Sequence, residues 1–146
     1  MGRLEKIWVK RAHRGRMDPA TDGVLDAGKG LCDNANYGGR RQVTIISAER
    51  WAEIEDDLEV EIDPSARRAN LMVSGVDLEN SRDRVLRVGP CLLRIGGETR
   101  PCERMDEAHQ GLQEAMKPRW GGGAWAIVVE GGPIAVGDEV AWVSTP

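Results

Sequence analysis

Short apolar segments separated by glycine-rich turns are the feature that most restricts how this chain can fold. The chain holds 18 glycines in 146 residues. Glycine adopts the backbone conformations that tight turns require, so frequent glycines favour strands joined by turns over long helices. No apolar run approaches the ~18 residues that a membrane-spanning helix needs. We therefore expect a β-rich fold without a membrane segment.

The spacing of apolar residues predicts about eight short strands and two helices. The predicted strands cover residues 4–11, 42–47, 70–75, 85–88, 91–95, 124–129, 134–136 and 140–143, with a further short one at 24–25. The predicted helices cover residues 48–58 and 103–116, where apolar residues recur at helical spacing. The expected fold class is mainly β (a β-rich α+β), a closed or partly closed antiparallel β-barrel with two main helices. We expect residues 1–146 to form one domain.

Charge and cysteine usage exclude several classes of function. Lysine and arginine number 20 against 24 acidic residues, so the net charge is −4, and nucleic-acid binding driven by net charge is not expected. The three cysteines are too few and too irregular for a disulfide framework. With two histidines and no C-x-x-C motif, no zinc site of the usual spacing is expected. A reducing cytoplasm is the simplest setting.

Cys102 is the strongest candidate for chemistry. It lies between Pro101 and a predicted helix start, with Arg100 and Arg104 on either side. A helix N-terminus and nearby cations favour the thiolate, which is the nucleophilic and metal-binding form, while Glu103 opposes them. The alternative is a cysteine that packs at the start of a helix.

The other two cysteines have different surroundings. Cys91 alternates with Leu93 and Ile95, so we expect it to be a small core residue. Cys32 lies in a glycine-rich loop, where no role is predicted for it.

Two arginine pairs, Arg40-Arg41 and Arg67-Arg68, precede predicted strands. The planar guanidinium group suits phosphate or carboxylate, so the pairs could converge on an anionic ligand. The alternative is that they are solvated surface residues. Asn70 follows at the start of a strand, where its amide could offer a donor and an acceptor to a heterocycle edge, or simply end a turn.

Five segments, taken in order, resemble the MOSC domain, the module at the C-terminus of molybdenum-cofactor sulfurases. These are Gly30-Leu31 followed by Asp33, R-R-Q-V-T-I-I at 40–46, R-R-A-N-L-M-V-S-G at 67–75, R-P-C-E-R-M at 100–105 and G-G-G-A-W-A-I-V-V-E-G-G at 121–132. The chain is similar to the short, stand-alone bacterial members of that family.

The resemblance implies a β-rich barrel in which Cys102 is the family's cysteine and a ligand of molybdenum. It also implies that Arg68 and Asn70 contact the anionic pterin of the molybdenum cofactor (molybdopterin). We expect these residues to line one pocket with Cys102, and Arg41 or Arg100 to lie at its rim.

The resemblance leaves more than one function open. The first is an oxidoreductase that uses the molybdenum cofactor to reduce N-hydroxylated substrates, with a redox partner protein. The second is a sulfur carrier that holds a persulfide on Cys102, received from a pyridoxal-phosphate-dependent cysteine desulfurase. The third is a module that binds an anionic small molecule without chemistry. Neither nucleic acid nor a membrane is an expected partner.

Overall fold

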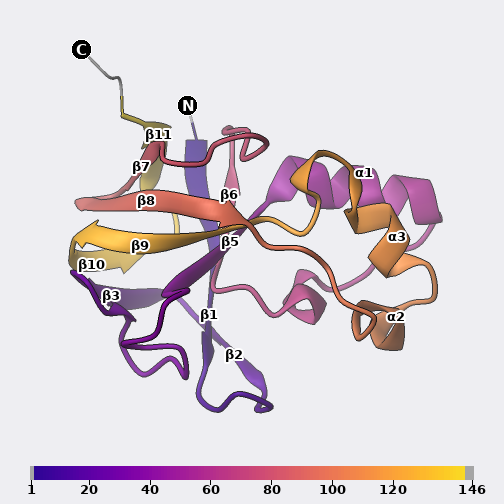
Figure 1. Cartoon of the computed structure of the whole chain (residues 1–146), viewed down its shortest axis with the longest axis horizontal. Helices are drawn as coiled ribbons and strands as arrows, with labels where there is room; N and C mark the ends of the chain where they lie inside the picture. The colour runs from indigo at the N-terminus through magenta and orange to yellow at the C-terminus, as the bar shows by residue number, and fades with distance from the viewer. Residues whose placement is uncertain (1, 144–146) are drawn as a thin grey trace.

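The computed structural model describes residues 2–143, and seven of its strands close into a mixed β-barrel (Figure 1). The barrel strands are β1 (Gly2–Lys10), β5 (Val43–Ser47), β6 (Leu71–Ser74), β7 (Val85–Val88), β8 (Cys91–Glu98), β9 (Ala124–Glu130) and β11 (Glu139–Trp142). Their order around the barrel is β11-β7-β8-β9-β5-β6-β1, and β11 pairs with β1 to close it. The expected mainly β fold with a closed barrel is confirmed.

Four shorter strands lie outside this ring of seven. The strand β2 (Met17–Ala20) pairs with the end of β1, and β3 (Asp22–Asp26), β4 (Gly30–Leu31) and β10 (Gly132–Ala135) form a separate three-stranded sheet. Neither β2 nor β4 was expected, because β2 has a proline at Pro19 and β4 has only two residues. Both lack the alternation of apolar residues by which a strand is found in sequence.

One pair of barrel strands is parallel rather than antiparallel. Strands β5 and β6 run in the same direction, with Ile45 opposite Leu71. Parallel neighbours need a long crossover connection. Here it contains α1 (Ala48–Leu58) and the short 3-10 helix η1 (Pro64–Arg67). The crossover brings the arginine pair at the end of η1 directly to the start of β6.

The first predicted helix is confirmed at both ends. Ser47 accepts a hydrogen bond from the backbone N–H of Arg50 at 3.2 Å and thereby caps α1. Trp51 and Ile54 are buried on its inner face. The helix ends at Leu58, and Glu59 after it adopts the left-handed conformation.

The second predicted helix, over residues 103–116, is wrong, because this segment does not form one continuous helix. The segment forms α2 (Met105–Ala108) and α3 (Leu112–Met116), followed by a further 3-10 turn, η2 (Pro118–Trp120). His109 is extended with φ −163°, and Gly111 has φ +91°, which breaks the helical path between them. The apolar spacing continued across this break because Met105 of α2 and Leu112 and Met116 of α3 are buried in the same hydrophobic cluster. Glycine at 111 was the local signal for the break.

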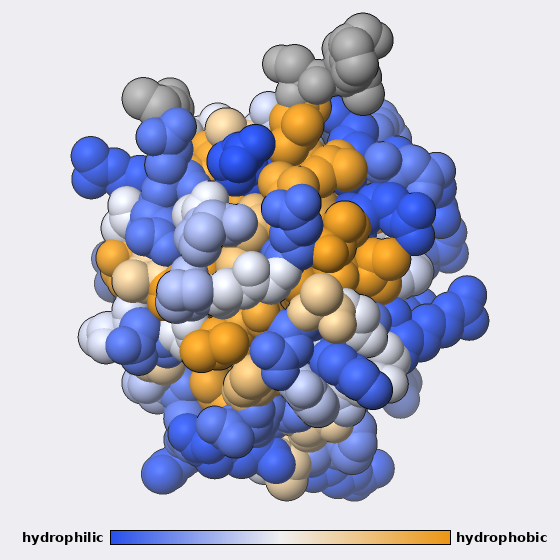
Figure 2. All heavy atoms as spheres, turned by 90° about the vertical axis from the view of Figure 1, so that its left-hand side faces the viewer, coloured by the Kyte–Doolittle hydropathy of each residue, from blue (hydrophilic) through white to orange (hydrophobic). Residues whose placement is uncertain are grey.

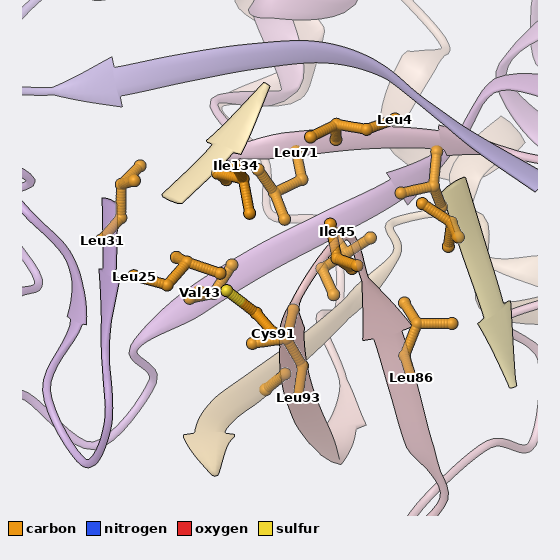
Figure 3. Packing of buried hydrophobic residues seen from close by; sticks show 14 of the residues in the cluster. Leu4, Leu25, Leu31, Val43, Ile45, Leu71, Leu86, Cys91, Leu93 and Ile134 are labelled. Carbon is orange, nitrogen blue, oxygen red and sulfur yellow. The ribbon is translucent and has the colours of Figure 1, made fainter. Parts of the chain in front are cut away.

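Two hydrophobic clusters organise the interior. One fills the barrel, and the other lies between the barrel and its helices, which gather on one side of the molecule (Figure 1). Figure 3 shows part of the barrel cluster, with Cys91 among Val43, Leu93 and their neighbours. Cys91 is fully buried, so its expected place in the core is confirmed.

The face of the barrel turned away from the helices carries hydrophobic residues among hydrophilic ones (Figure 2). Among the hydrophobic surface residues, Val24, Val129 and Val136 are 46%, 47% and 44% exposed. Much of any folded protein's surface is apolar, so exposed valines alone mark no site. Within residues 2–143, no helix is long and apolar enough to cross a membrane.

Candidate functional site

Cys102 is exposed in the segment that joins β8 to α2. Its carbonyl oxygen accepts a hydrogen bond from the backbone N–H of Met105 at 3.0 Å. The helix that begins there has only four residues, so it contributes less to stabilising a thiolate than the long helix expected from the sequence. The thiol is accessible rather than packed at a helix start.

Arg67 holds the Cys102 segment in place from the neighbouring crossover. Its side chain is buried, with 8% of its surface exposed. Its Nε donates to the carbonyl oxygen of Gly122 at 2.8 Å and its Nη2 to that of Thr99 at 3.2 Å. Its Nη1 approaches the sulfur of Met105 at 3.9 Å. Thr99 and Met105 lie on either side of Cys102 in the chain. One guanidinium group therefore contacts both ends of the segment from Thr99 to Met105.

Arg67 has no carboxylate partner among the residues that the structure describes. Its hydrogen-bond acceptors are neutral. Burial lowers the pKa of Arg67, and electrostatic attraction to the thiolate form of Cys102 opposes that shift. No direct ion pair with a described carboxylate therefore balances the charge of Arg67.

Arg68 points to a different part of the molecule from Arg67. It ends η1 in the left-handed conformation, with φ +62°. Its Nη2 donates to the carbonyl oxygen of Gly15 at 2.6 Å and to that of His13 at 3.4 Å, both in the loop between β1 and β2. Burial lowers the pKa of Lys10, and the positive charge of Arg68 adds to that effect. Arg68 thus belongs to a basic group beside this loop.

Asn70 is an internal residue of the fold, with 2% of its surface exposed. Its Oδ1 accepts from the backbone N–H of Thr44 at 3.1 Å and from the hydroxyl of Thr44 at 3.3 Å. Its Nδ2 donates to the carbonyl oxygen of Trp8 at 3.2 Å and to Oδ1 of Asn34 at 3.0 Å. These bonds use the full capacity of the amide. In contrast to the sequence-based expectation, Asn70 has no free donor or acceptor to offer a heterocycle.

A basic cavity of about 340 Å³ lies beside the loop that contains Asn34. It is lined by His13, Ala35, Asn36, Tyr37, Gly39, Arg40 and Arg41, with no carboxylate among the described lining residues. Arg41 also lies over the ring of Trp125, 5.7 Å from its centre. The Nδ2 of Asn34 is buried without a hydrogen-bond partner among the described residues. Its two arginines give the cavity a positive charge.

Arg100, the second expected rim residue, lies two residues before Cys102 in the chain. Its side chain is 89% exposed, and its Nε lies 3.9 Å from the carboxylate of Glu98. Cys102 does not line the basic cavity, so the structure places the expected residues in two groups. Cys102 and Arg67 form one group, with Arg100 nearby in the chain. Arg41 and Arg68 belong to the other.

Sequence comparison assigns the chain to a known family. The model of the MOSC domain matches residues 33–141. The chain belongs to the MOSC domain family. The matched span includes both arginine pairs and Cys102, so the resemblance seen in the short motifs is confirmed.

Solved structures share the fold of this MOSC domain. The YuaD protein from Bacillus subtilis superposes with a TM-score of 0.82 at 24% identity, over 96% of this chain and 94% of that one. YiiM from Geobacillus stearothermophilus gives 0.79 at 15% identity, over 99% of this chain and 76% of that one. YiiM from Escherichia coli gives 0.71 at 15% identity, over 99% and 71%. No curated protein matches the sequence. At these identities the likeness shows the fold alone.

The other two cysteines of the MOSC domain sit in surroundings that oppose ionisation. Cys32 is half-buried and donates from Sγ to Oδ2 of Asp26 at 3.2 Å. Burial raises the pKa of the Cys32 thiol, and the hydrogen bond and charge of Asp26 raise it further. Burial also raises the pKa of Cys91, with a smaller contribution from Asp138.

We expect Cys102 to be alkylated first when the native protein meets iodoacetamide at neutral pH. The thiolate is the reactive form, and each unit by which a thiol pKa rises lowers its thiolate fraction about tenfold at neutral pH. Cys102 is exposed, whereas Cys91 is buried and both other thiols have raised pKa values. Peptide mass spectrometry over a time course measures the order. Labelling of Cys91 or Cys32 before Cys102 in the folded protein would contradict it.

Proposed function

We propose that this MOSC protein binds the molybdenum cofactor and reduces N-hydroxylated substrates, with Cys102 as the ligand of the metal. The observation that carries the proposal is an exposed thiol beside a buried arginine that has no carboxylate partner among the described residues. The association of the MOSC domain family with this cofactor supports it. The proposal also places the protein in the cytoplasm, where its three free cysteines stay reduced.

The donor set suits this cofactor in its chemistry. A thiolate is a soft ligand for a metal of this kind. Within residues 2–143, no three His, Cys, Asp or Glu side chains gather as a metal site. The cavity lined by His13, Arg40 and Arg41 offers the positive charge that a phosphate-bearing pterin needs.

Each group of residues then has a distinct task. Cys102 binds the metal through its sulfur, and Arg67 fixes the segment that presents that sulfur. Arg40, Arg41 and His13 bind the phosphate, and Arg68 holds the β1–β2 loop beside them. Arg100 is exposed and lies two residues before Cys102 in the chain, where it could contact an anionic part of a ligand. When bound, the cofactor would supply a redox-active metal; reduction of an N-hydroxylated substrate to the amine and water would consume two protons and two electrons, which a redox partner protein would provide.

Metal and pterin analysis of the purified protein tests this function. The protein is produced in a host that synthesises the cofactor, beside a known molybdenum enzyme as a positive control. We expect stoichiometric molybdenum and pterin, and reduction of an N-hydroxylated amidine when an artificial electron donor is supplied. A metal-free protein from a culture in which the control enzyme is loaded would overturn the proposal.

The exposure of Cys102 also favours a second function, that of a sulfur carrier. A thiol in an exposed turn is accessible to the active site of another protein. Its thiolate would attack the terminal sulfur of a persulfide on a pyridoxal-phosphate-dependent cysteine desulfurase, form a new S–S bond and release the enzyme's thiolate. Incubation with such an enzyme and cysteine should then add the mass of one sulfur atom to the Cys102 peptide.

A further inference from the structure

We propose that a second pocket, beside α1, binds a free α-amino acid with an apolar side chain. The pocket has a volume of about 290 Å³, and its lining comes from the start of α1, the segment between β6 and β7, and η2. It shares no described lining residue with the basic cavity, and Cys102 does not line it. The inference therefore goes beyond the proposed function and does not rest on it.

The first observation is a buried arginine with unused donors at this pocket. Arg50, in the first turn of α1, lines the pocket, and only 9% of its surface is exposed. Its Nη2 donates to the carbonyl oxygens of Ala115 at 3.1 Å and Pro118 at 3.2 Å. Its Nε and Nη1 are buried without a hydrogen-bond partner among the described residues. Buried donors without acceptors are costly, so Arg50 favours an acceptor from a ligand, and a carboxylate matches its charge.

The two carboxylates nearest to Arg50 in the chain are engaged elsewhere. Oε2 of Glu49 accepts a hydrogen bond from the backbone N–H of Gly75 at 2.8 Å. Glu53 forms an ion pair with Arg119. Arg50 itself forms no ion pair with any carboxylate of residues 2–143. Its guanidinium group therefore remains available to the carboxylate of a small molecule.

The segment between β6 and β7 adds negative charge to the same pocket through Asp77 and Glu79. Oδ1 of Asp77 accepts from the backbone N–H of Glu79 at 2.9 Å, and neither carboxylate forms an ion pair with a described cation. Among the described lining residues, four carboxylates stand against two arginines. This balance disfavours a dianion such as phosphate, whereas a ligand with one negative and one positive group satisfies both kinds of residue.

Apolar side chains complete the lining. Val76, Leu78 and Trp120 border the pocket, and all three pack within or against the barrel cluster. Apolar walls with a few charged groups are typical of small-molecule sites, and the volume is near the lower end of their range of ~300–1,000 Å³. The lining thus matches the three parts of an apolar α-amino acid. Arg50 faces its carboxylate, the carboxylates after β6 face its ammonium group, and the apolar residues face its side chain.

Calorimetric titration of the wild-type protein tests the proposal. The ligands are L-leucine, L-valine and L-methionine, together with two analogues of leucine. Isoamylamine lacks the carboxylate, and isocaproate lacks the ammonium group. We expect leucine to bind about tenfold more tightly than either analogue, because each analogue leaves a charged group of the pocket without its partner. Inorganic phosphate should not compete with leucine, which distinguishes this pocket from the basic cavity.

Substitutions then assign the binding to the two charged sides of the pocket. We expect Arg50→Met to weaken leucine binding about tenfold and Arg50→Lys, which keeps the charge, to recover part of it. Glu79→Gln should weaken the binding of leucine but not that of isocaproate. Glu107→Gln is the matched control, because Glu107 is an exposed carboxylate on α2 outside the pocket. It should bind leucine like the wild type.

Three outcomes overturn the inference. The first is that none of the three amino acids binds, and the second is that leucine binds no more tightly than isoamylamine or isocaproate, or is displaced by phosphate. The third is that Glu79→Gln binds leucine as well as Glu107→Gln does. The first two need no variant, so the test holds even if Arg50→Met does not fold. Failure of the protein to load molybdenum would overturn the proposed function alone.

Discussion

Cys102→Ser is expected to abolish both molybdenum loading and persulfide formation while leaving the fold intact. Serine nearly preserves the size of the side chain but removes the soft metal ligand and the sulfur acceptor. Cys102 is exposed and its thiol makes no hydrogen bond to a described residue, so the free energy of unfolding should change by less than about 0.5 kcal/mol. Metal analysis, peptide mass spectrometry and denaturant unfolding measure the three quantities.

Cys32→Ser is the matched control for this variant. Cys32 is also outside the core, but it lies beside Asp26 and its thiol pKa is raised. It should therefore retain metal and persulfide at wild-type levels. If Cys102→Ser retains both as well, neither chemical role belongs to Cys102, and the protein is better described as a module that binds an anion without chemistry.

Asn70→Ala is expected to destabilise the fold by about 3 kcal/mol, because it leaves buried donors and acceptors without partners. The amide of Asn70 joins Thr44 on β5, Trp8 on β1 and Asn34 in the loop between β4 and β5. Removing it frees polar groups at the point where these three segments meet. Chemical denaturation, followed by the fluorescence of the buried tryptophans, measures the loss.

Asn36→Ala provides the matched control. Asn36 lines the basic cavity, and its side chain makes no hydrogen bond within the described part of the chain, so its removal should cost little stability. If Asn70→Ala instead unfolds like the wild type and loses only its bound cofactor, the ligand-binding role drawn from the family motif is right, and the internal role found here is wrong.

The sequence predicted most of the fold because the fold depends on local patterns. Alternating apolar residues indicated most of the barrel strands, Ser47 indicated the start of α1, and Trp51 and Ile54 indicated its buried face. The parallel pairing of β5 with β6 was not predictable from those patterns. Strand direction depends on how the crossover packs, which no short window of residues contains.

The site was harder to predict, because burial separates residues that look alike in sequence. Arg67 and Arg68 are neighbours of the same type, yet one is buried beside the Cys102 segment and the other contacts the β1–β2 loop. Their side chains diverge because the chain leaves η1 through a left-handed residue at Arg68. Asn70 likewise became an internal residue only because three distant segments converge on it.

The closing contact of the barrel has a consequence for synthesis of the protein. Gly2 and Arg3 at the start of β1 pair with Val140 and Glu139 in β11. The ribosome releases β1 first among these strands and β11 last, so the nascent barrel stays open until nearly the whole chain has emerged. Throughout that interval the interior face, including the Cys91 thiol, is accessible to chaperones and oxidants. A stalled chain that ends before residue 139 would therefore keep its core exposed.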